Sequence, residues 1–157
     1  MTNKLKIQEK WKDSFILGYD CIVYGNGKIT IGEHYSCFNP NNNETKYYWT
    51  PICDTTLDKI EKYDDDIWTE VDIFHGSLVY KNQKIVFGDG GMGNEGYIAS
   101  VKLNGELKWS IFFTFSNPIC KAEIIDNHLI CYGDTGTKIN INLKELHKIK
   151  IDYTNKI

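Results

Sequence analysis

"LVYKNQKIVFGD", residues 78–89, decides the fold, because two other parts of the chain repeat its pattern. Residues 22–33 read "IVYGNGKITIGE", and residues 123–134 read "EIIDNHLICYGD". Each copy contains an apolar run, a short turn centred on an asparagine, a second apolar run and a final Gly-acid pair. Short apolar runs on either side of such a turn are typical of a β-hairpin, in which asparagine tolerates a positive φ. The sequence therefore predicts three equivalent hairpins.

The flanks of the three hairpins are also alike. A tryptophan that opens an apolar stretch precedes each hairpin, and a further candidate strand follows it. The tryptophans are Trp11, Trp68 and Trp109, and the following strands span 45–49, 96–103 and 137–143. Each unit then has about four strands, and the Gly-acid pairs are 56 and 45 residues apart. This period is typical of β-propeller blades.

We therefore expect an all-β fold in a single domain, residues 1–157, which is long enough to have its own apolar core. Three four-stranded antiparallel units, at 11–50, 68–108 and 109–149, would form an open, half-propeller-like fan. The terminal segments would cap its end units. A β-trefoil also contains three four-stranded units and is the alternative fold.

The second and third units resemble the junction between blades in quinoprotein-like β-propellers. The segments that carry the resemblance are "VKLNGELKWS" (101–110), "NPI" (117–119), "DNHLICYGDTG" (126–136) and "ININLKE" (139–145). The resemblance implies architecture alone. The residues that bind quinone or metal in the enzymes of that group have no counterpart in this chain.

The first unit contains an insertion, residues 39–67. Its first part, "NPNNNET" at 39–45, has the composition of a polar loop. Its second part has a weak capping pattern and places Leu57 and Ile60 on one helical face. The sequence therefore predicts one short helix near 56–63.

The end of the insertion and the residues after it carry most of the negative charge. Between residues 58 and 72 there are seven acids and two lysines, a local charge of −5 against −3 for the whole chain. Consecutive aspartates repel one another, and a basic partner would offset that repulsion. We expect a partner-binding surface made of Glu61, Tyr63, Asp64, Asp65, Asp66, Trp68, Glu70 and Asp72. The alternative is a solvated acidic loop that serves solubility.

Patterns for other chemistry are weak. "GDGGMGNEG" at 88–96 precedes a strand, whereas a phosphate cradle precedes a helix. His34, Cys37 and Cys53 lack the second close pair of a zinc site. The four histidines are scattered, and no serine or cysteine has the context of an activated nucleophile. We expect no catalytic residue, no metal and no cofactor.

Composition restricts the partners and the compartment. All 18 basic residues are lysines and the net charge is −3, which disfavours direct binding of nucleic acid. No apolar signal region or membrane-spanning run is visible, and the five cysteines are an odd number. We therefore expect a cytoplasmic protein with reduced thiols and no membrane contact. Cys21, Cys120 and Cys131 occupy strand positions where small buried side chains fit.

These observations favour a non-catalytic binding protein. In its size, its aromatic content and its localised acidity, the chain looks like bacterial immunity proteins, which are antitoxins. That resemblance implies a cognate toxin, and a nuclease with a basic cleft is the partner that an acidic aromatic patch would complement. An alternative is a structural module whose edge strands pair to form a homodimer or a larger propeller. A carbohydrate-binding β-trefoil is a further alternative.

Overall fold

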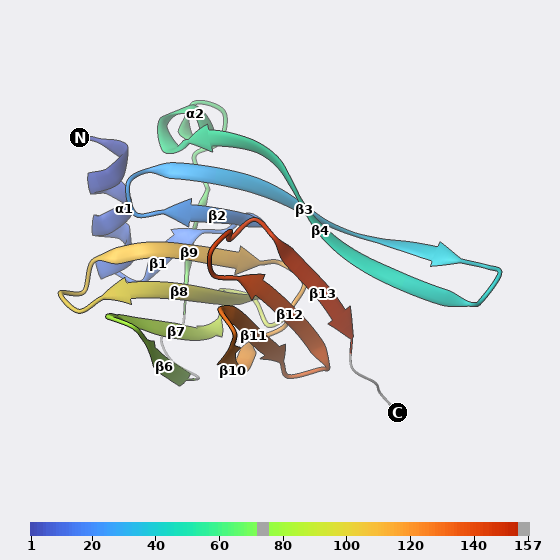
Figure 1. Ribbon diagram of the computed structural model, residues 1–157. Helices are drawn as coiled ribbons and strands as arrows, with labels where there is room; N and C mark the ends of the chain where they lie inside the picture. Colours follow the sequence, from blue (N-terminus) through green and yellow to red (C-terminus); the bar gives the residue numbers. More distant parts are fainter. Residues whose placement is uncertain (72–75, 154–157) are drawn as a thin grey trace.

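The computed structural model describes residues 1–71 and 76–153, and within these ranges the protein is all-β with two short helices (Figure 1). The all-β prediction is confirmed. The helices are α1 (Asn3–Lys12) and α2 (Leu57–Glu61). The strands are β1 (Phe15–Leu17), β2 (Cys21–Tyr24), β3 (Lys28–Asn39), β4 (Glu44–Thr56), β5 (Trp68–Glu70), β6 (Gly76–Tyr80), β7 (Gln83–Asp89), β8 (Gly96–Lys102), β9 (Leu107–Phe113), β10 (Ile119–Ile125), β11 (His128–Gly133), β12 (Thr137–Asn142) and β13 (Ile149–Tyr153).

Eleven of the described strands form one antiparallel sheet in the order β10-β11-β12-β13-β4-β3-β2-β9-β8-β7-β6. The sheet curls so that its two edge strands, β6 and β10, contact each other. The result is a nearly closed barrel, visible at the lower centre of Figure 1. β1 and β5 pair separately as a two-stranded sheet.

The three predicted hairpins are present as β2–β3, β6–β7 and β10–β11. The residues that adopt a positive φ differ from one turn to the next. Asn127 itself has a φ of 63°, but Gly27 and Lys81 take this conformation in the other two turns. The repeated phrase therefore predicted the pairing of strands better than the conformation of each turn.

The arrangement of the units differs from a fan of separate blades. β2 pairs with β9, and β4 pairs with β13, so that all three hairpins belong to one sheet. The physical reason is that each isolated unit would leave unpaired backbone groups at its edges, and a shared ladder satisfies them. The strand of Trp68 leaves this sheet to pair with β1.

The N-terminal segment forms a helix that the sequence reasoning missed. The Thr2 side chain caps α1 by accepting a hydrogen bond from the backbone N–H of Leu5. Ile7 is the buried residue of the helix, so its apolar stripe is too narrow for a clear helical pattern. Trp11, predicted to open a strand, lies in this helix and packs against the apolar cluster beneath it.

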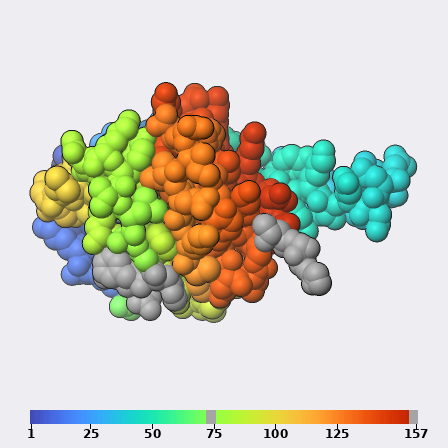
Figure 2. Space-filling model, turned by 60° about the horizontal axis from the view of Figure 1, so that its bottom comes forward, coloured from blue at the N-terminus to red at the C-terminus, as the bar shows by residue number. Residues whose placement is uncertain are grey.

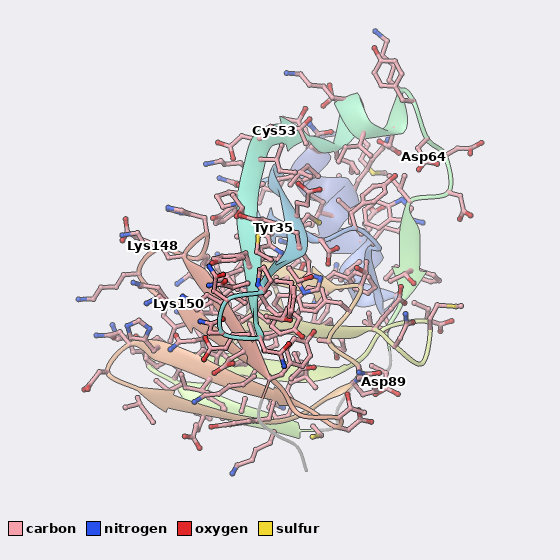
Figure 3. The ribbon with its side chains drawn as sticks, turned by 90° about the vertical axis from the view of Figure 1, so that its right-hand side faces the viewer. Tyr35, Cys53, Asp64, Asp89, Lys148 and Lys150 are labelled. Atoms are coloured by element: carbon pink, nitrogen blue, oxygen red, sulfur yellow. The ribbon has the colours of Figure 1, made fainter. Side chains whose placement is uncertain are left out.

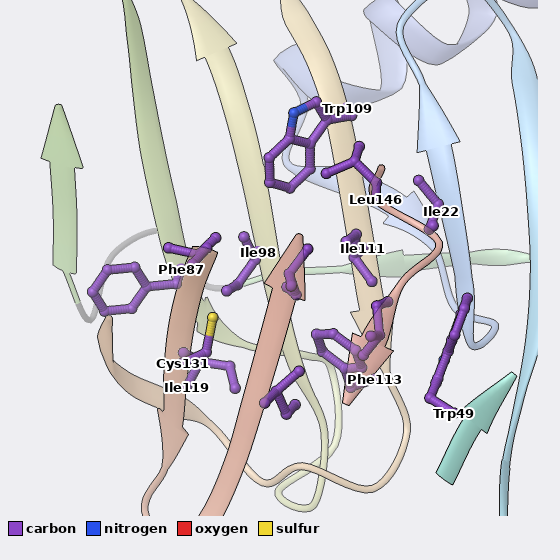
Figure 4. Close-up of a cluster of buried hydrophobic side chains, with 14 of the residues drawn as sticks. Ile22, Trp49, Phe87, Ile98, Trp109, Ile111, Phe113, Ile119, Cys131 and Leu146 are labelled. Atoms are coloured by element: carbon purple, nitrogen blue, oxygen red, sulfur yellow. The ribbon is translucent and has the colours of Figure 1, made fainter. Parts of the chain in front are cut away.

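Two apolar clusters lie on opposite faces of the sheet. The barrel core fills the interior and includes Phe87, Ile98, Trp109 and Phe113 (Figure 4). The outer core lies between the outer face of the sheet and α1, α2, β1 and β5. Strands such as β8 are therefore buried on both faces.

β3 and β4 have 12 and 13 residues and are far longer than the other strands of the barrel. Its register shifts between Ile31 and Gly32, and such a bulge bends a strand away from its neighbours. Residues 33–50 are called the arm from here on. At its root, Trp49 is buried in the barrel core and Tyr48 pairs with Lys150 of β13, and the part toward the tip projects beyond the body (Figures 1 and 2). The predicted loop at 39–45 is the tip of the arm, whereas α2 lies within the predicted helix at 56–63, which is confirmed.

Candidate partner-binding face

The acidic segment is attached to the outer core by a few apolar side chains. Leu57, Ile67 and Val71 are buried, and Ile60 packs against the same cluster. These anchors occupy one side of the segment, so the charged residues between them point outward. The segment from 57 to 71 is therefore held in a fixed position on the surface by its apolar contacts with the outer core.

The centre of this segment is strongly exposed. Tyr63 is 84% exposed, and Asp64, Asp65 and Asp66 are all exposed. The Asp64 carboxylate accepts hydrogen bonds from the Tyr19 hydroxyl and, at 3.1 Å, from the backbone N–H of Asp66. Asp65 and Asp66 form no ion pair within the described ranges. Their charges are therefore available to a partner.

Hydrogen bonding shifts the titration of the groups at this position. The Tyr19 hydroxyl, followed by the backbone N–H of Asp66, holds the pKa of Asp64 below its ordinary value. Burial, and then the hydrogen bond to Asp64, raises the pKa of Tyr19 to about 12. The pair therefore keeps Asp64 ionised and Tyr19 protonated at neutral pH.

Other predicted site residues interact within the molecule itself. Glu61 pairs with Lys6 at 3.0 Å, and Lys10 lies over the Trp68 ring with its nitrogen 5.3 Å from the centroid. Glu70 is exposed on β5. Asp72, the last predicted residue, lies outside the described residues. The structure thus brings Tyr63 and the three aspartates together, while α1 covers part of the rest.

A groove of about 550 Å³ lies between α2 and the root of the arm. Tyr19, Ile60, Tyr63 and Asp64 line its acidic side, and Cys53 lines the side formed by β4. Figure 3 looks along the arm and shows Asp64 and Cys53 above its root, away from Lys148 and Lys150. The groove therefore extends from the acidic segment to the strands at the root of the arm.

The arm carries exposed aromatic side chains that sequence reasoning missed. Tyr35 and Tyr48 stack with their ring centroids 5.2 Å apart, and the Thr50 hydroxyl donates to the Tyr35 oxygen at 3.3 Å. Phe38, near the tip, is 59% exposed. The strand at 45–49 was predicted, and the equally aromatic stretch at 34–38 was the signal for its partner strand.

The cysteines do not gather into a site. Cys21 and Cys131 are buried as predicted, but Cys120 is exposed on the outer face of β10, so that prediction is wrong. Cys37 and Cys53 are both exposed, at different levels of the hairpin. Residues 1–71 and 76–153 contain no group of three His, Cys, Asp or Glu side chains able to hold a metal ion.

Comparisons with known proteins give no further assignment. No protein-family model and no curated protein matches this chain. Neither helix within the described ranges is long and apolar enough to cross a membrane. The geometry of the site is therefore the basis for a functional proposal.

Proposed function

We propose that this protein is a non-catalytic binding protein, specifically an immunity protein that neutralises a cognate bacterial toxin. The toxin would be a nuclease whose basic cleft ordinarily holds nucleic acid. The observation that carries the proposal is the exposure of Tyr63 beside Asp65 and Asp66, two carboxylates without an ion pair among the described residues. An exposed aromatic ring flanked by free carboxylates complements a basic cleft.

The acidic segment is suited to fast and specific association. Its apolar anchors hold Tyr63 and the aspartates in position, which reduces the entropy lost on binding. The hydrogen bond from Tyr19 fixes Asp64 beside them. In this proposal Asp65 and Asp66 stand in for phosphate groups, and Tyr63 enters the cleft as the apolar anchor.

The test uses the product of the neighbouring reading frame, which this proposal expects to contain the nuclease domain. We expect the wild-type protein to inhibit that nuclease and the variant Asp65→Asn/Asp66→Asn to bind it about tenfold more weakly at low salt. Titration calorimetry at low and high salt measures both affinities, and the difference between the two proteins should shrink at high salt. Tyr63→Ala tests the aromatic anchor separately.

A matched control removes the same charge elsewhere. Asp126→Asn/Asp134→Asn changes two exposed aspartates in the turns at either end of β11, and it should bind like the wild type. Equal affinity of the acidic-segment variant and this control at low salt would show that the segment is not the contact. A wild-type protein that leaves the nuclease active would exclude the immunity function itself.

The arm favours a second candidate, an assembly module. The two edge strands of the observed sheet, β6 and β10, contact each other, but within the described residues β3 pairs only with β4 beyond Gly32. Unpaired strand edges recruit further strands. Molar mass by light scattering distinguishes the candidates, since a dimer that Tyr35→Ser/Tyr48→Ser converts to a monomer would favour assembly through the arm.

A further inference from the structure

A second cavity lies at one end of the barrel, away from the acidic segment. Its volume is about 390 Å³, and four elements and one loop contribute to it. Its side chains come from β2, β6, β7 and β9 and from the loop between β12 and β13; those used below are Tyr24, Tyr80, Gln83, Lys108, Trp109 and Lys144. Barrel mouths of this size commonly hold small molecules.

Trp109 supplies an unused hydrogen-bond donor. Its side chain is only 6% exposed, and its indole N–H donates to no residue within the described ranges. Figure 4 shows the indole nitrogen on the edge of the ring that faces the N-terminal end of β9. The indole nitrogen itself is not enclosed, so a ligand in the cavity can reach it and accept a hydrogen bond from it.

Two tyrosines form the apolar walls. The Tyr80 hydroxyl donates to the Asn127 side chain at 2.7 Å, which holds its ring in place. Lysine nitrogens lie over both rings, Lys28 at 5.5 Å from the Tyr24 centroid and Lys81 at 5.2 Å from the Tyr80 centroid. The walls are therefore flat aromatic surfaces with a lysine over one face of each ring, and Lys28 is also paired with Asp54 at 3.5 Å.

The rim of the cavity carries positive charge without matching acids. Lys108 and Lys144 form no ion pair within the described ranges. Glu145, the acid that lines the cavity, is bound by Lys148 at 2.7 Å. An adjoining groove that shares Gln83 and Lys108 is also lined by Lys81, which extends the positive surface outward, and by Lys102, which is paired with Glu106 at 3.8 Å.

The loop that closes one side of the cavity is held firmly. The Asn142 side chain accepts from the backbone N–H of Lys144 at 2.9 Å, and the N–H of Leu143 donates to the Asn127 carbonyl at 2.9 Å. Leu146 inserts into the barrel core beside Trp109 (Figure 4). The cavity is thus pre-formed, which favours binding because little ordering is needed.

We propose that this cavity binds a small organic anion, a planar ring that bears a carboxylate or a phosphate. The oxyanion accepts from the Trp109 indole N–H and from the Gln83 amide, and Lys108 and Lys144 balance its charge. The ring lies between Tyr24 and Tyr80. This site is independent of the proposed toxin contact, because it shares no residue with the acidic segment or its groove.

The test is a titration followed by NMR of the tryptophan indole N–H signals. The probes are adenosine 5′-monophosphate and indole-3-carboxylate, with adenosine, indole and inorganic phosphate as their uncharged or ringless counterparts. We expect at least one anionic ring compound to shift the Trp109 signal, which Trp109→Phe identifies by its absence. Its counterparts should bind about tenfold more weakly, since each lacks either the charge or the ring.

Two double variants with equal loss of charge locate the site. Lys108→Met/Lys144→Met should weaken the binding of the anionic probe about tenfold. Lys121→Met/Lys138→Met changes two lysines whose strands pair on either side of β11, outside the cavity, and should leave it unchanged. The carboxylate and phosphate probes show which oxyanion is preferred. Three results would overturn the proposal. Neither anionic probe binds, the uncharged or ringless counterparts bind equally well, or the two double variants have equal affinity for the anionic probe.

Discussion

The barrel body and the arm are made of the same kind of hairpin but differ in what surrounds them. In β7, Ile85 and Phe87 face the barrel core while Val86 faces the outer core, so both faces are covered. In the arm, Phe38 and the stacked Tyr35 and Tyr48 are exposed. Aromatic content alone therefore does not decide burial. Burial depends on the height of the barrel, because a hairpin that is longer than its neighbouring strands must extend past them into solvent.

The largest expected effect comes from removing the same side chain in the two regions. Phe113→Ala leaves a cavity in the barrel core, where Phe113 is 0% exposed, and should lower the free energy of unfolding by about 3–5 kcal/mol. Phe38→Ala in the arm should change it by about 0.5 kcal/mol or less. Urea unfolding followed by circular dichroism measures both. A large loss from Phe38→Ala would mean that the arm is part of the folding unit.

The bend where the arm leaves the body gives the next prediction. A Cβ atom on Gly32 would lie 2.0 Å from the Trp49 ring, so Gly32→Ala forces the ring or the bulge to move. We expect a loss of about 1–3 kcal/mol in the free energy of unfolding. Gly93→Ala is the matched control, because a Cβ at that position meets no atom within 4 Å. Equal stability of the two variants would show that Trp49 does not pack tightly against the bulge.

The smallest effect concerns the groove between the body and the arm. Tyr19→Phe removes the hydrogen bond to Asp64, so the pKa of Asp64 should rise toward its ordinary value of 3.8. Because the pKa of Asp64 is lower in the folded state than in the unfolded state, the bond stabilises the protein fully at a pH above the ordinary pKa. This stabilisation is lost as the pH falls through the folded-state pKa. The stabilities of wild type and variant should therefore converge in acid.

NMR titration of the Asp64 carboxyl carbon measures this shift directly. Asp54 is the internal reference, since the Thr30 hydroxyl and Lys28 lower its pKa independently of Tyr19. An Asp64 titration that is unchanged in Tyr19→Phe would contradict the assignment of the hydrogen bond.

The parts of the fold that local sequence controls could be predicted. The turns between β2 and β3, β6 and β7, and β10 and β11 were visible because their residues are consecutive. The pairings of β2 with β9 and β4 with β13 could not be read, since they join segments that are distant in sequence and no local pattern encodes them. Propensity predicted α2, but α1 was hidden by its narrow apolar stripe.

The candidate site was predictable to a similar extent. Charge counting found the segment around Asp64 because a run of like charges is visible without a structure. It could not show that Lys6 and Lys10 of α1 would cover Glu61 and Trp68, which depends on tertiary packing. The aromatic cavity at Trp109 was missed for the same reason, since its walls come from five separate parts of the chain.

The junction between β4 and β13 rests on one residue pair, Tyr48 with Lys150, whereas β7 and β8 are paired along seven residues. The eleven strands thus follow one another in a single sheet, but the ladder of paired residues is very short between β4 and β13. Amide protons on the facing edges of β4 and β13 should exchange with deuterium earlier than those of β7 and β8. The C-terminal meander from β10 to β13 would then open as a flap on that side while the remaining strands stay closed.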